Sequence, residues 1–260
     1  MADRLRMRSS VRNALMWRTL QAALADLTAT LGREQLDVLD AGGGTGGIAV
    51  PLAELGHRVT VVDTSPDSLA ALERRAAEAG VTGRVRGVPG DAASIPELLL
   101  SGAGPGDTGQ RGFDLAVCHS VLELVDDPVA VLAGVARALR PQGLVSIVAA
   151  NAVAAALHRA IAGRFDEALH ALRDPLGRYG PHDPMPRRFS SSGLRSVVEA
   201  AGLTVVATHG ARVFADVVPA ASLDADPQAA DALAELELQA ADVPALRDVA
   251  AALHVIARLD

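Results

Sequence analysis

The order of apolar and polar segments along the chain predicts an α/β protein. Short apolar runs that end at turn residues predict strands at 36–41, 58–63, 84–88, 113–120, 143–150, 203–217 and 252–259. Between them, apolar residues at helical spacing predict helices at 18–31, 47–56, 65–80, 127–141, 191–202 and 230–240. Strands that alternate with helices form a parallel sheet covered on both faces, and right-handed crossovers make it doubly wound. We therefore expect a doubly wound, mostly parallel sheet of seven strands.

Two segments interrupt this alternation. Residues 101–112, "SGAGPGDTGQRG", are rich in glycine and predict a surface loop. Residues 151–190 begin with a helical pattern and end in the irregular stretch "DPLGRYGPHDPMPRRF". Loops of this length in a compact domain often act as lids or binding loops. The predicted organisation is an N-terminal helical cap (1–35) and a main domain (36–260) that carries an insertion (151–190).

The helix predicted at 65–80 has clear signals at both ends. Ser65 can accept a hydrogen bond from the first turn, Pro66 suits the first helical position, and Gly80 suits the end.

Composition limits the class of protein. Half of the 260 residues are hydrophobic but only 2% are aromatic, so the core must be aliphatic. No apolar run reaches the ~18 residues that a membrane span needs, and the first residues lack the apolar stretch of a secretory signal. The single cysteine, Cys118, excludes an intramolecular disulfide and a cysteine cluster for a metal ion. We expect a cytoplasmic protein without a metal site.

Charge is uneven along the chain. The net charge is −7, and all 24 basic residues are arginine. Residues 1–20 hold five Arg and one Asp, residues 155–195 hold seven Arg and four acids, and residues 216–260 hold two Arg and nine acids. Such runs either form solvated faces or bring the Arg-rich segments close to a polyanion.

The stretch "LDAGGGTGG" (39–47) follows the first predicted strand. Gly42, Gly44 and Gly47 complete the G-x-G-x-x-G pattern of dinucleotide-binding loops. In an open parallel sheet, a ligand binds beyond the carboxyl ends of the strands, where glycines allow close approach and a helix N-terminus offers free N–H groups. A nucleoside cofactor without phosphate fits this loop equally well.

Asp40 favours one of these two ligands. It precedes the glycines by two residues, and its carboxylate would repel a pyrophosphate at short range. S-adenosylmethionine has no phosphate and carries an ammonium and a sulfonium, which a carboxylate complements. The alternative is that Asp40 only caps the turn.

Two further acids end the second and third predicted strands. Asp63 can accept both hydroxyls of a ribose, a role that S-adenosylmethionine and NAD share, or it can cap the following helix. Asp91, in "VPGDAAS", can reach an adenine edge or can serve only as a turn residue.

From residue 36 to about 149, the sequence resembles the class I S-adenosylmethionine-dependent methyltransferases. The motifs are "VLDAGGGTG", "VTVVDTSPDSL", "PGDAAS", "FDLAVCHSVLELVDDP" and "LRPQGLVSIV". A narrower resemblance extends over nearly the whole chain, to the bacterial tRNA 5-carboxymethoxyuridine methyltransferase family. The motifs that carry it include "VRNALMWRTL", "NAVAAALHRAIAGRFDEAL", "GARVFADV" and the final "HVIAR".

The resemblance implies a Rossmann-like fold, S-adenosylmethionine as the cofactor, and methyl transfer to a carboxylate oxygen of a modified wobble uridine in tRNA. It implies cofactor contacts at Arg12, Gly42, Gly43, Asp63, Gly90 and His119. With the residues argued above and their neighbours, the predicted cofactor site comprises Arg12, Asp40, Gly42, Gly43, Gly44, Asp63, Thr64, Gly90, Asp91, Ala92 and His119.

A carboxylate acceptor is ionised at neutral pH, so its methylation requires alignment but no general base. Alignment requires cations, and an arginine fork matches a carboxylate. The candidates are Arg212, then Arg187 and Arg188, although Arg212 can also be an ordinary surface residue of a strand. His119 can act as a base for another nucleophile or can line the cofactor pocket. Glu123 is expected to pair locally or to remain solvated.

Two other functions stay open. A small-molecule O- or N-methyltransferase would use residues 151–190 as a substrate lid. A nucleoside-binding or NAD-dependent protein would use the same glycine loop, although Asp40 disfavours NAD. The expected partner is tRNA or a small molecule, without a membrane, and the sequence does not determine the oligomeric state.

Overall fold

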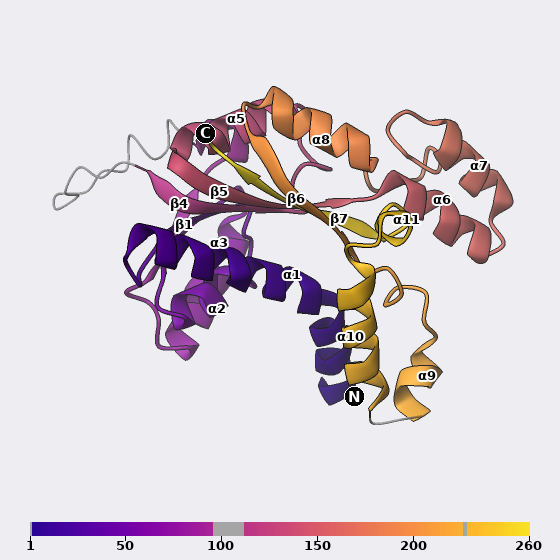
Figure 1. The fold of residues 1–260 in the computed structure, drawn as a ribbon, viewed down its shortest axis with the longest axis horizontal. Coiled ribbons are helices and arrows are strands. Elements are labelled where there is room, and N and C mark those ends of the chain that lie inside the picture. Colours follow the sequence, from indigo (N-terminus) through magenta and orange to yellow (C-terminus); the bar gives the residue numbers. More distant parts are fainter. Residues whose placement is uncertain (1, 96–111, 226–227) are drawn as a thin grey trace. The chain divides into compact units, whose positions relative to one another are not determined.

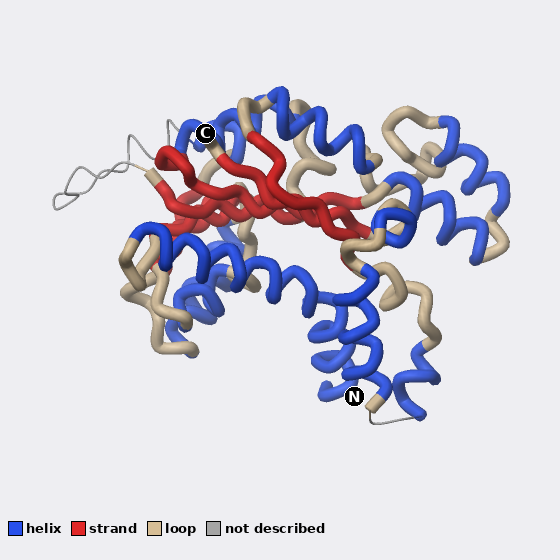
Figure 2. The backbone as a smooth tube through the Cα atoms, in the orientation of Figure 1, coloured by secondary structure: helices blue, strands red, loops and turns tan. Residues whose placement is uncertain are grey.

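The computed structural model describes residues 2–95, 112–225 and 228–260, and the side chains of residues 2–12, 220, 224 and 225 lie outside that description. A seven-stranded sheet has the order β3-β2-β1-β4-β5-β7-β6 (Figures 1 and 2). Its strands are β1 (Asp37–Ala41), β2 (Arg58–Asp63), β3 (Val85–Pro89), β4 (Phe113–His119), β5 (Leu139–Ala150), β6 (Thr204–Ala211) and β7 (Ala252–Arg258). The loop predicted at 101–112 falls, except for Gly112, outside the described residues.

The sheet is mostly parallel, as the sequence predicts. β1 pairs in parallel with β2 and β4, and β2 pairs in parallel with β3. β7 runs antiparallel to β5, because Gln142 near the start of β5 bonds to Leu259 after β7, whereas Asn151 after β5 bonds to Ala251 before β7. The predicted class of fold is therefore confirmed.

Contacts divide the chain into two compact units. The first unit comprises Ala23–Ile147, Ser196–Val206 and Ile256–Asp260. It includes α2 (Ala49–Glu54), α3 (Pro66–Glu78), the 3₁₀ turn η1 (Ala92–Ser94) and α5 (Pro128–Ala138). Figure 1 shows α5 on one face of the β1–β4 region and α2 and α3 on the other. The apolar side chains of β1 and β4 are fully buried, with the exception of Phe113 at the start of β4.

The second unit comprises Met1–Ala22, Val148–Arg195 and Ala207–Val255. Its helices include α6 (Ala152–Ile161), α7 (Phe165–Arg173), α9 (Ala220–Ala225), α10 (Ala229–Ala240) and α11 (Pro244–Arg247). Two helices, α1 (Ala2–Leu31) and α8 (Ser191–Ala200), contribute residues to both units. The boundary predicted between residues 35 and 36 stays a prediction.

Helix α1 begins far earlier than the predicted start at residue 18. Residues 2–17, "ADRLRMRSSVRNALMW", contain neither glycine nor proline and are rich in strong helix formers, so the helix continues through them. The frequent arginines hide the apolar periodicity on which the prediction relied. In the described part of the chain, no helix is long and apolar enough to cross a membrane.

The boundary between α5 and β5 also differs from the prediction. The helix ends at Ala138, and β5 begins at Leu139 instead of residue 143. Gln142, with a φ of +66°, donates its N–H to the Leu259 carbonyl at 2.9 Å, so pairing with the end of the chain converts the predicted helix terminus into strand. The local signals of α3 are confirmed, because Ser65 Oγ accepts the Ser68 N–H at 3.2 Å and Gly80 has a φ of +71°.

Candidate functional site

The glycine turn after β1 is a tight structure in the first unit. Gly42 and Gly44 have φ values of +72° and +55°, which glycine adopts without strain. The Gly42 N–H donates to the Val62 carbonyl at 2.7 Å, and a Cβ at Gly42 would lie 2.5 Å from Val121 Cγ2. Gly47 has no positive φ and meets nothing closer than 3.9 Å. The third glycine of the dinucleotide pattern is therefore not required by the backbone here.

Asp40 is a buried acid that faces this turn. Its side chain lies against Gly43, where an added Cβ would be 2.3 Å from Asp40 Oδ2. Asp40 is 2% exposed, and Oδ2 has no hydrogen-bond partner among the described residues. Burial, and then the charge of Asp63, raise the pKa of Asp40 to about 7. A carboxylate in this state is stabilised by a cation that reaches Oδ2, whereas an anion would be repelled.

Asp63, at the end of β2, joins the turn to α3. Its Oδ2 accepts the Gly44 N–H and its Oδ1 accepts the Ser65 N–H, both at 2.9 Å. Ser65, and not Asp63, caps α3, so the Asp63 carboxylate instead links the glycine turn to the residue that precedes the helix. Each oxygen keeps a second acceptor site, so the half-buried group can still receive a hydroxyl. Thr64 beside it is exposed.

The end of β3 lies against the same strand terminus. The Gly90 N–H donates to the Asp63 carbonyl at 3.0 Å. Asp91 is exposed, and its Oδ1 accepts the Ala93 N–H at 2.8 Å, which caps η1. Ala92 is buried at 7% exposure. The structure thus gives Asp91 a turn role, and a contact with adenine stays a prediction.

His119, the last residue of β4, is half-buried and neutral. Its Nε2 lies 2.8 Å from the Oγ of Ser146, a fully buried serine of β5. Burial lowers the pKa of His119 to about 3, so the imidazole is a weak base near neutral pH. Ser146 was not singled out from the sequence, although a hydroxyl inside the apolar run "LVSIV" was a visible signal.

The alternative that Glu123 remains solvated was wrong, whereas local pairing stays a prediction. Glu123 is 2% exposed, whereas its neighbour Leu124 is 65% exposed. The segment after β4 is a turn that begins with Ser120 at a φ of +57°, and it has neither helical nor strand periodicity. Local pattern therefore could not identify which of these side chains points inward.

The predicted substrate arginines lie in the second unit. Arg212 follows β6 with a φ of +60° instead of lying in the strand, and its Nη1 is 3.7 Å from Asp216 Oδ2. Arg188 forms a bidentate pair with Asp183 at 2.6 and 3.1 Å and also donates to the Gly177 carbonyl. Arg187 is half-buried. The side chain of Arg12 lies outside the described residues.

Two polar residues of the second unit were not identified from the sequence. Asn151, at the end of β5, donates from Nδ2 to the carbonyls of Asp248 and Ala250 and caps α6 through the Val153 N–H. Glu237 of α10 is 1% exposed and accepts backbone N–H groups. The sequence did indicate that Glu237 is unusual, because it lies in the buried stripe of α10 with Leu233 and Ala240, where an apolar residue is expected.

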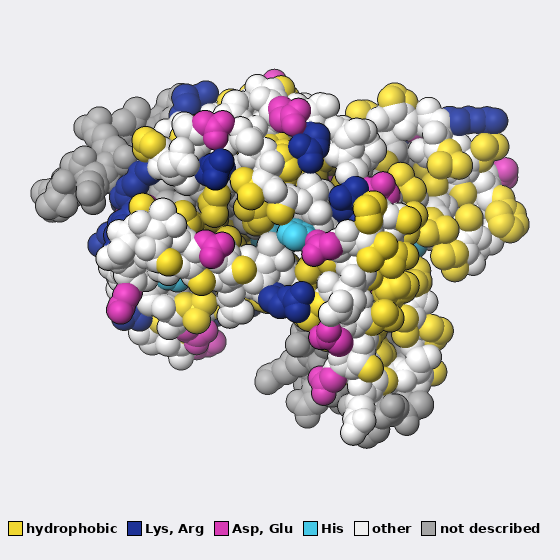
Figure 3. Space-filling view, in the orientation of Figure 1, with side chains coloured by type: hydrophobic (Ala, Val, Ile, Leu, Met, Phe, Trp, Pro, Cys, Tyr) yellow, Lys and Arg dark blue, Asp and Glu magenta, His cyan; other side chains and the backbone are white. Residues whose placement is uncertain are grey.

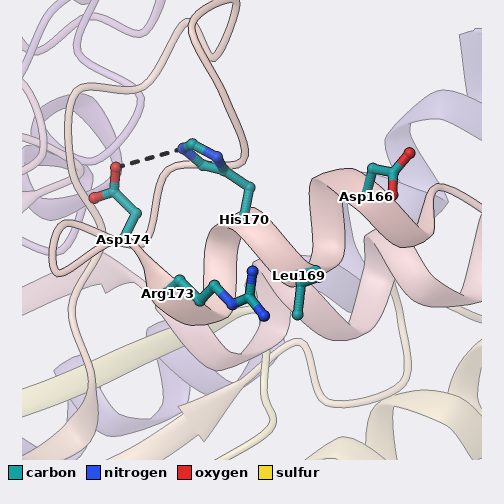
Figure 4. A pocket seen from close by; sticks show the side chains of 5 residues that line it. All are labelled: Asp166, Leu169, His170, Arg173 and Asp174. Carbon is teal, nitrogen blue, oxygen red and sulfur yellow. Dashed lines mark ion pairs between the residues drawn. The ribbon is translucent and has the colours of Figure 1, made fainter.

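The surface of the insertion carries apolar side chains, which Figure 3 shows gathered over α6 and α7. A shallow pocket on α7 is lined by Asp166, Leu169, His170, Arg173 and Asp174 (Figure 4). Among the described residues, no group of three or more His, Cys, Asp or Glu side chains could hold a metal ion.

Comparisons with known proteins identify the family of the chain. A family model described as a methyltransferase domain matches residues 16–208. The tRNA 5-carboxymethoxyuridine methyltransferase of Escherichia coli K12 is 30% identical over 213 residues, which is 80% of this chain and 74% of that protein. The ubiquinone biosynthesis O-methyltransferase of Caulobacter vibrioides is 34% identical over 124 residues, 48% of this chain and 44% of that protein.

Solved structures share the fold at low sequence identity. A protein from Galdieria sulphuraria, described as a sarcosine dimethylglycine methyltransferase, has a TM-score of 0.56 and 17% identity. The match covers 93% of this chain and 86% of that one. The plantazolicin methyltransferase BamL, solved with S-adenosylhomocysteine, has a TM-score of 0.57 and 15% identity, covering 96% and 85%.

Proposed function

Because the chain belongs to the methyltransferase-domain family of S-adenosylmethionine-dependent enzymes, we propose that it methylates a carboxylate oxygen of 5-carboxymethoxyuridine in tRNA. The observation that carries this proposal is the extent of the match to the Escherichia coli tRNA enzyme. The match spans 80% of the chain and is therefore longer than the whole first unit. It must include part of the second unit, which contains the candidate substrate residues.

The first unit is the proposed cofactor site. The unpartnered Oδ2 of buried Asp40 fits the ammonium of S-adenosylmethionine. The second acceptor sites of Asp63 fit the ribose hydroxyls, and Gly44 leaves space for close approach, whereas the space beside Gly42 and Gly43 is taken by Val121 and Asp40. Gly90, Ala92 and Thr64 border the same strand ends, and Arg12 stays in the proposed site on the resemblance alone.

S-adenosylmethionine, when bound, supplies a methyl group on a sulfonium, which is already a strong electrophile. The protein then has to hold the acceptor carboxylate in line with this methyl. We assign that role first to Arg212, whose side chain is half-buried and next to a positive-φ turn, and second to Arg187. Arg188 is committed to Asp183, which favours a structural role for its guanidinium.

His119 fits a pocket-lining role better than a catalytic one. A pKa of about 3 keeps the imidazole neutral and makes it a poor proton acceptor at neutral pH. An ionised carboxylate acceptor needs no base, so the proposed reaction agrees with this weak basicity.

The decisive experiment is mass spectrometry of tRNA nucleosides from a strain that lacks the gene. We expect the methyl ester of 5-carboxymethoxyuridine to disappear and the free acid to accumulate, and the wild-type gene to restore the ester. A plasmid that encodes Asp63→Ala should not restore it, because the proposed ribose contact is lost. An unchanged wobble-uridine profile would reject the tRNA assignment.

A small-molecule O-methyltransferase is the second candidate. The similarity to the Caulobacter vibrioides enzyme favours it, but at 48% of the chain this match is no longer than the first unit alone. Methylation of tRNA predicts a cytoplasmic location and affinity that falls steeply with salt, whereas a small substrate predicts weak salt dependence.

A further inference from the structure

Glu237 binds a backbone segment of its own unit. Its Oε2 accepts the Val213 N–H at 2.8 Å, and its Oε1 accepts the N–H groups of Phe214 and Ala215 at 2.8 and 2.6 Å. Three consecutive amides therefore converge on one carboxylate that is 1% exposed. Hydrogen bonds to an ionised acceptor are stronger than those between neutral groups, so this contact fixes the segment firmly.

The segment begins at Arg212, the proposed substrate arginine. Arg212 has a φ of +60°, a conformation that side chains other than glycine adopt only when their surroundings enforce it. Its carbonyl accepts the Ala251 N–H at 3.2 Å. Arg212 is thus held on one side by Ala251 and on the other by the amides bound to Glu237.

We infer that Glu237 is a positioning residue for the reaction, which holds Arg212 in its left-handed turn and thereby aims the guanidinium at the acceptor carboxylate. This inference rests on the proposed role of Arg212. The ionised carboxylate is essential to the arrangement, because three donors face two acceptor oxygens. A glutamine would offer one oxygen, and its NH₂ would face an N–H group.

The test is a double-mutant cycle on methyl transfer to tRNA. Glu237→Gln should raise the KM for tRNA about tenfold, because a small displacement of a positioning group weakens alignment. The Kd for S-adenosylhomocysteine should not change. Arg212→Ala should raise the KM by at least as much, and adding Glu237→Gln to Arg212→Ala should have no further effect. Glu235→Gln, on the exposed face of the same helix, is the matched control and should behave as the wild type.

Each failure has a distinct signature. If Arg212→Ala leaves the KM unchanged, the proposed role of Arg212 is wrong and the inference falls with it. If Arg212→Ala raises the KM but Glu237→Gln does not, or if the two effects multiply, only the positioning role is overturned. Amide hydrogen exchange at residues 213–215 gives a reading without substrate, and exchange that Glu237→Gln does not accelerate would also overturn the inference.

A separate observation concerns the solvent-facing side of α7. Phe165 and Leu172 are 72% and 69% exposed, and Leu169 between them is 45% exposed. Ile161, at the end of α6, is 65% exposed. Exposed apolar groups that gather in one place mark an interaction surface more often than an ordinary solvated face.

The charges on this face are arranged symmetrically. Asp166 and Arg173 flank Leu169 along the helix (Figure 4), and they are seven residues or about two turns apart. Neither charge has an ion-pair partner among the described residues. A two-fold axis near Leu169 would bring Asp166 next to Arg173 of the partner subunit and would bury the apolar groups between the helices.

We propose that this α7 face, defined by Phe165, Asp166, Leu169, Leu172 and Arg173, pairs antiparallel with the same face of a second copy of the chain. The charge pattern selects this occupant, because Asp166 and Arg173 lie on either side of Leu169 and would each meet the opposite charge in an isologous contact.

Sedimentation velocity over a concentration series tests the proposal by charge exchange. The wild type should show a concentration-dependent dimer. Asp166→Arg should be monomeric, because like charges then meet, and the double variant Asp166→Arg/Arg173→Asp should dimerise again. Glu78→Arg, which makes the same change of net charge at an exposed position of α3, is the matched control and should dimerise. A monomeric wild type, or equal behaviour of all four proteins, would overturn the proposal and leave the face to another partner.

Discussion

The state of Asp40 predicts that cofactor affinity depends on pH near neutrality. With a pKa of about 7, Asp40 is half ionised at neutral pH in the free protein, and only the ionised form attracts the ammonium of the ligand. Below about pH 7, each further pH unit should therefore raise the Kd for S-adenosylhomocysteine about tenfold, which equals about 1.4 kcal/mol. Above that pH the Kd should level off.

The size of the charge contribution follows from the buried geometry. Two unit charges about 4 Å apart attract with about 4 kcal/mol at an effective dielectric constant of 20. Asp40→Asn removes this attraction, so we expect the Kd at about pH 7.5 to rise at least about tenfold and to lose its dependence on pH. The same substitution relieves the buried charge, so it should not destabilise the free protein at neutral pH.

Calorimetric titration with S-adenosylhomocysteine between about pH 5.5 and 7.5 measures the Kd of the wild type and of Asp40→Asn. In this range the α-amino group of the ligand remains protonated. His119 does not interfere, because its pKa of about 3 keeps it neutral throughout. A wild-type Kd that stays constant over this range would refute the reasoning, as would an equal slope for Asp40→Asn.

Three further predictions use other contacts of the chain. Gly43→Ala should weaken cofactor binding by about 1–3 kcal/mol, because the new Cβ would overlap the Asp40 carboxylate, whereas Gly83→Ala, which meets nothing within 4 Å, should leave calorimetric affinity unchanged. Asp114→Ala should lower the free energy of unfolding in urea by about 2–3 kcal/mol, because the buried carboxylate accepts hydrogen bonds from Arg140 and from the Asp37 N–H; an effect under about 0.5 kcal/mol would contradict this reading. Burial alone would raise the pKa of Asp183, but hydrogen bonds from Arg188 and two backbone amides lower it. The ionised carboxylate therefore stabilises the fold fully above about pH 4, and this stabilisation is lost as the pH falls through the lowered pKa. In acid, limited proteolysis of the loop at 174–190 should increase more steeply in the wild type than in Asp183→Asn.

The elements of the first unit could be predicted because their signals are local. Ser65, Pro66 and Gly80 define α3, and the apolar run before Gly42 defines β1. The failed prediction for the start of β5 has a different cause, which is a distant contact. β5 begins early because Gln142 bonds to Leu259, more than a hundred residues away, and no local pattern contains that information.

The residues of the candidate site also divide into those with a local sequence signal and those that depend on distant contacts. Asp40 and Asp63 could be identified because motif and strand end coincide, and the structure adds that Oδ2 of Asp40 lacks a partner. Glu237 had a sequence signal, as an acid in the apolar stripe of α10, but its partners, which are backbone amides 22 to 24 positions earlier in the chain, could not be predicted. Arg212 was found as a residue but placed in a strand, since a positive φ outside glycine has no sequence signature.

The interleaving of the two units along the chain has a consequence for synthesis on the ribosome. The first unit draws on Ser196–Val206 and Ile256–Asp260, and the second ends only at Val255. Chains normally fold domain by domain as they emerge, but here the first unit cannot complete its contacts before Ile256–Asp260 is made, and the second cannot before Val255 is made. The nascent chain therefore exposes the edge of β5 from the time that strand is made until β7 has been made. Its folding should depend on chaperones that shield such edges more than that of a protein with two consecutive domains.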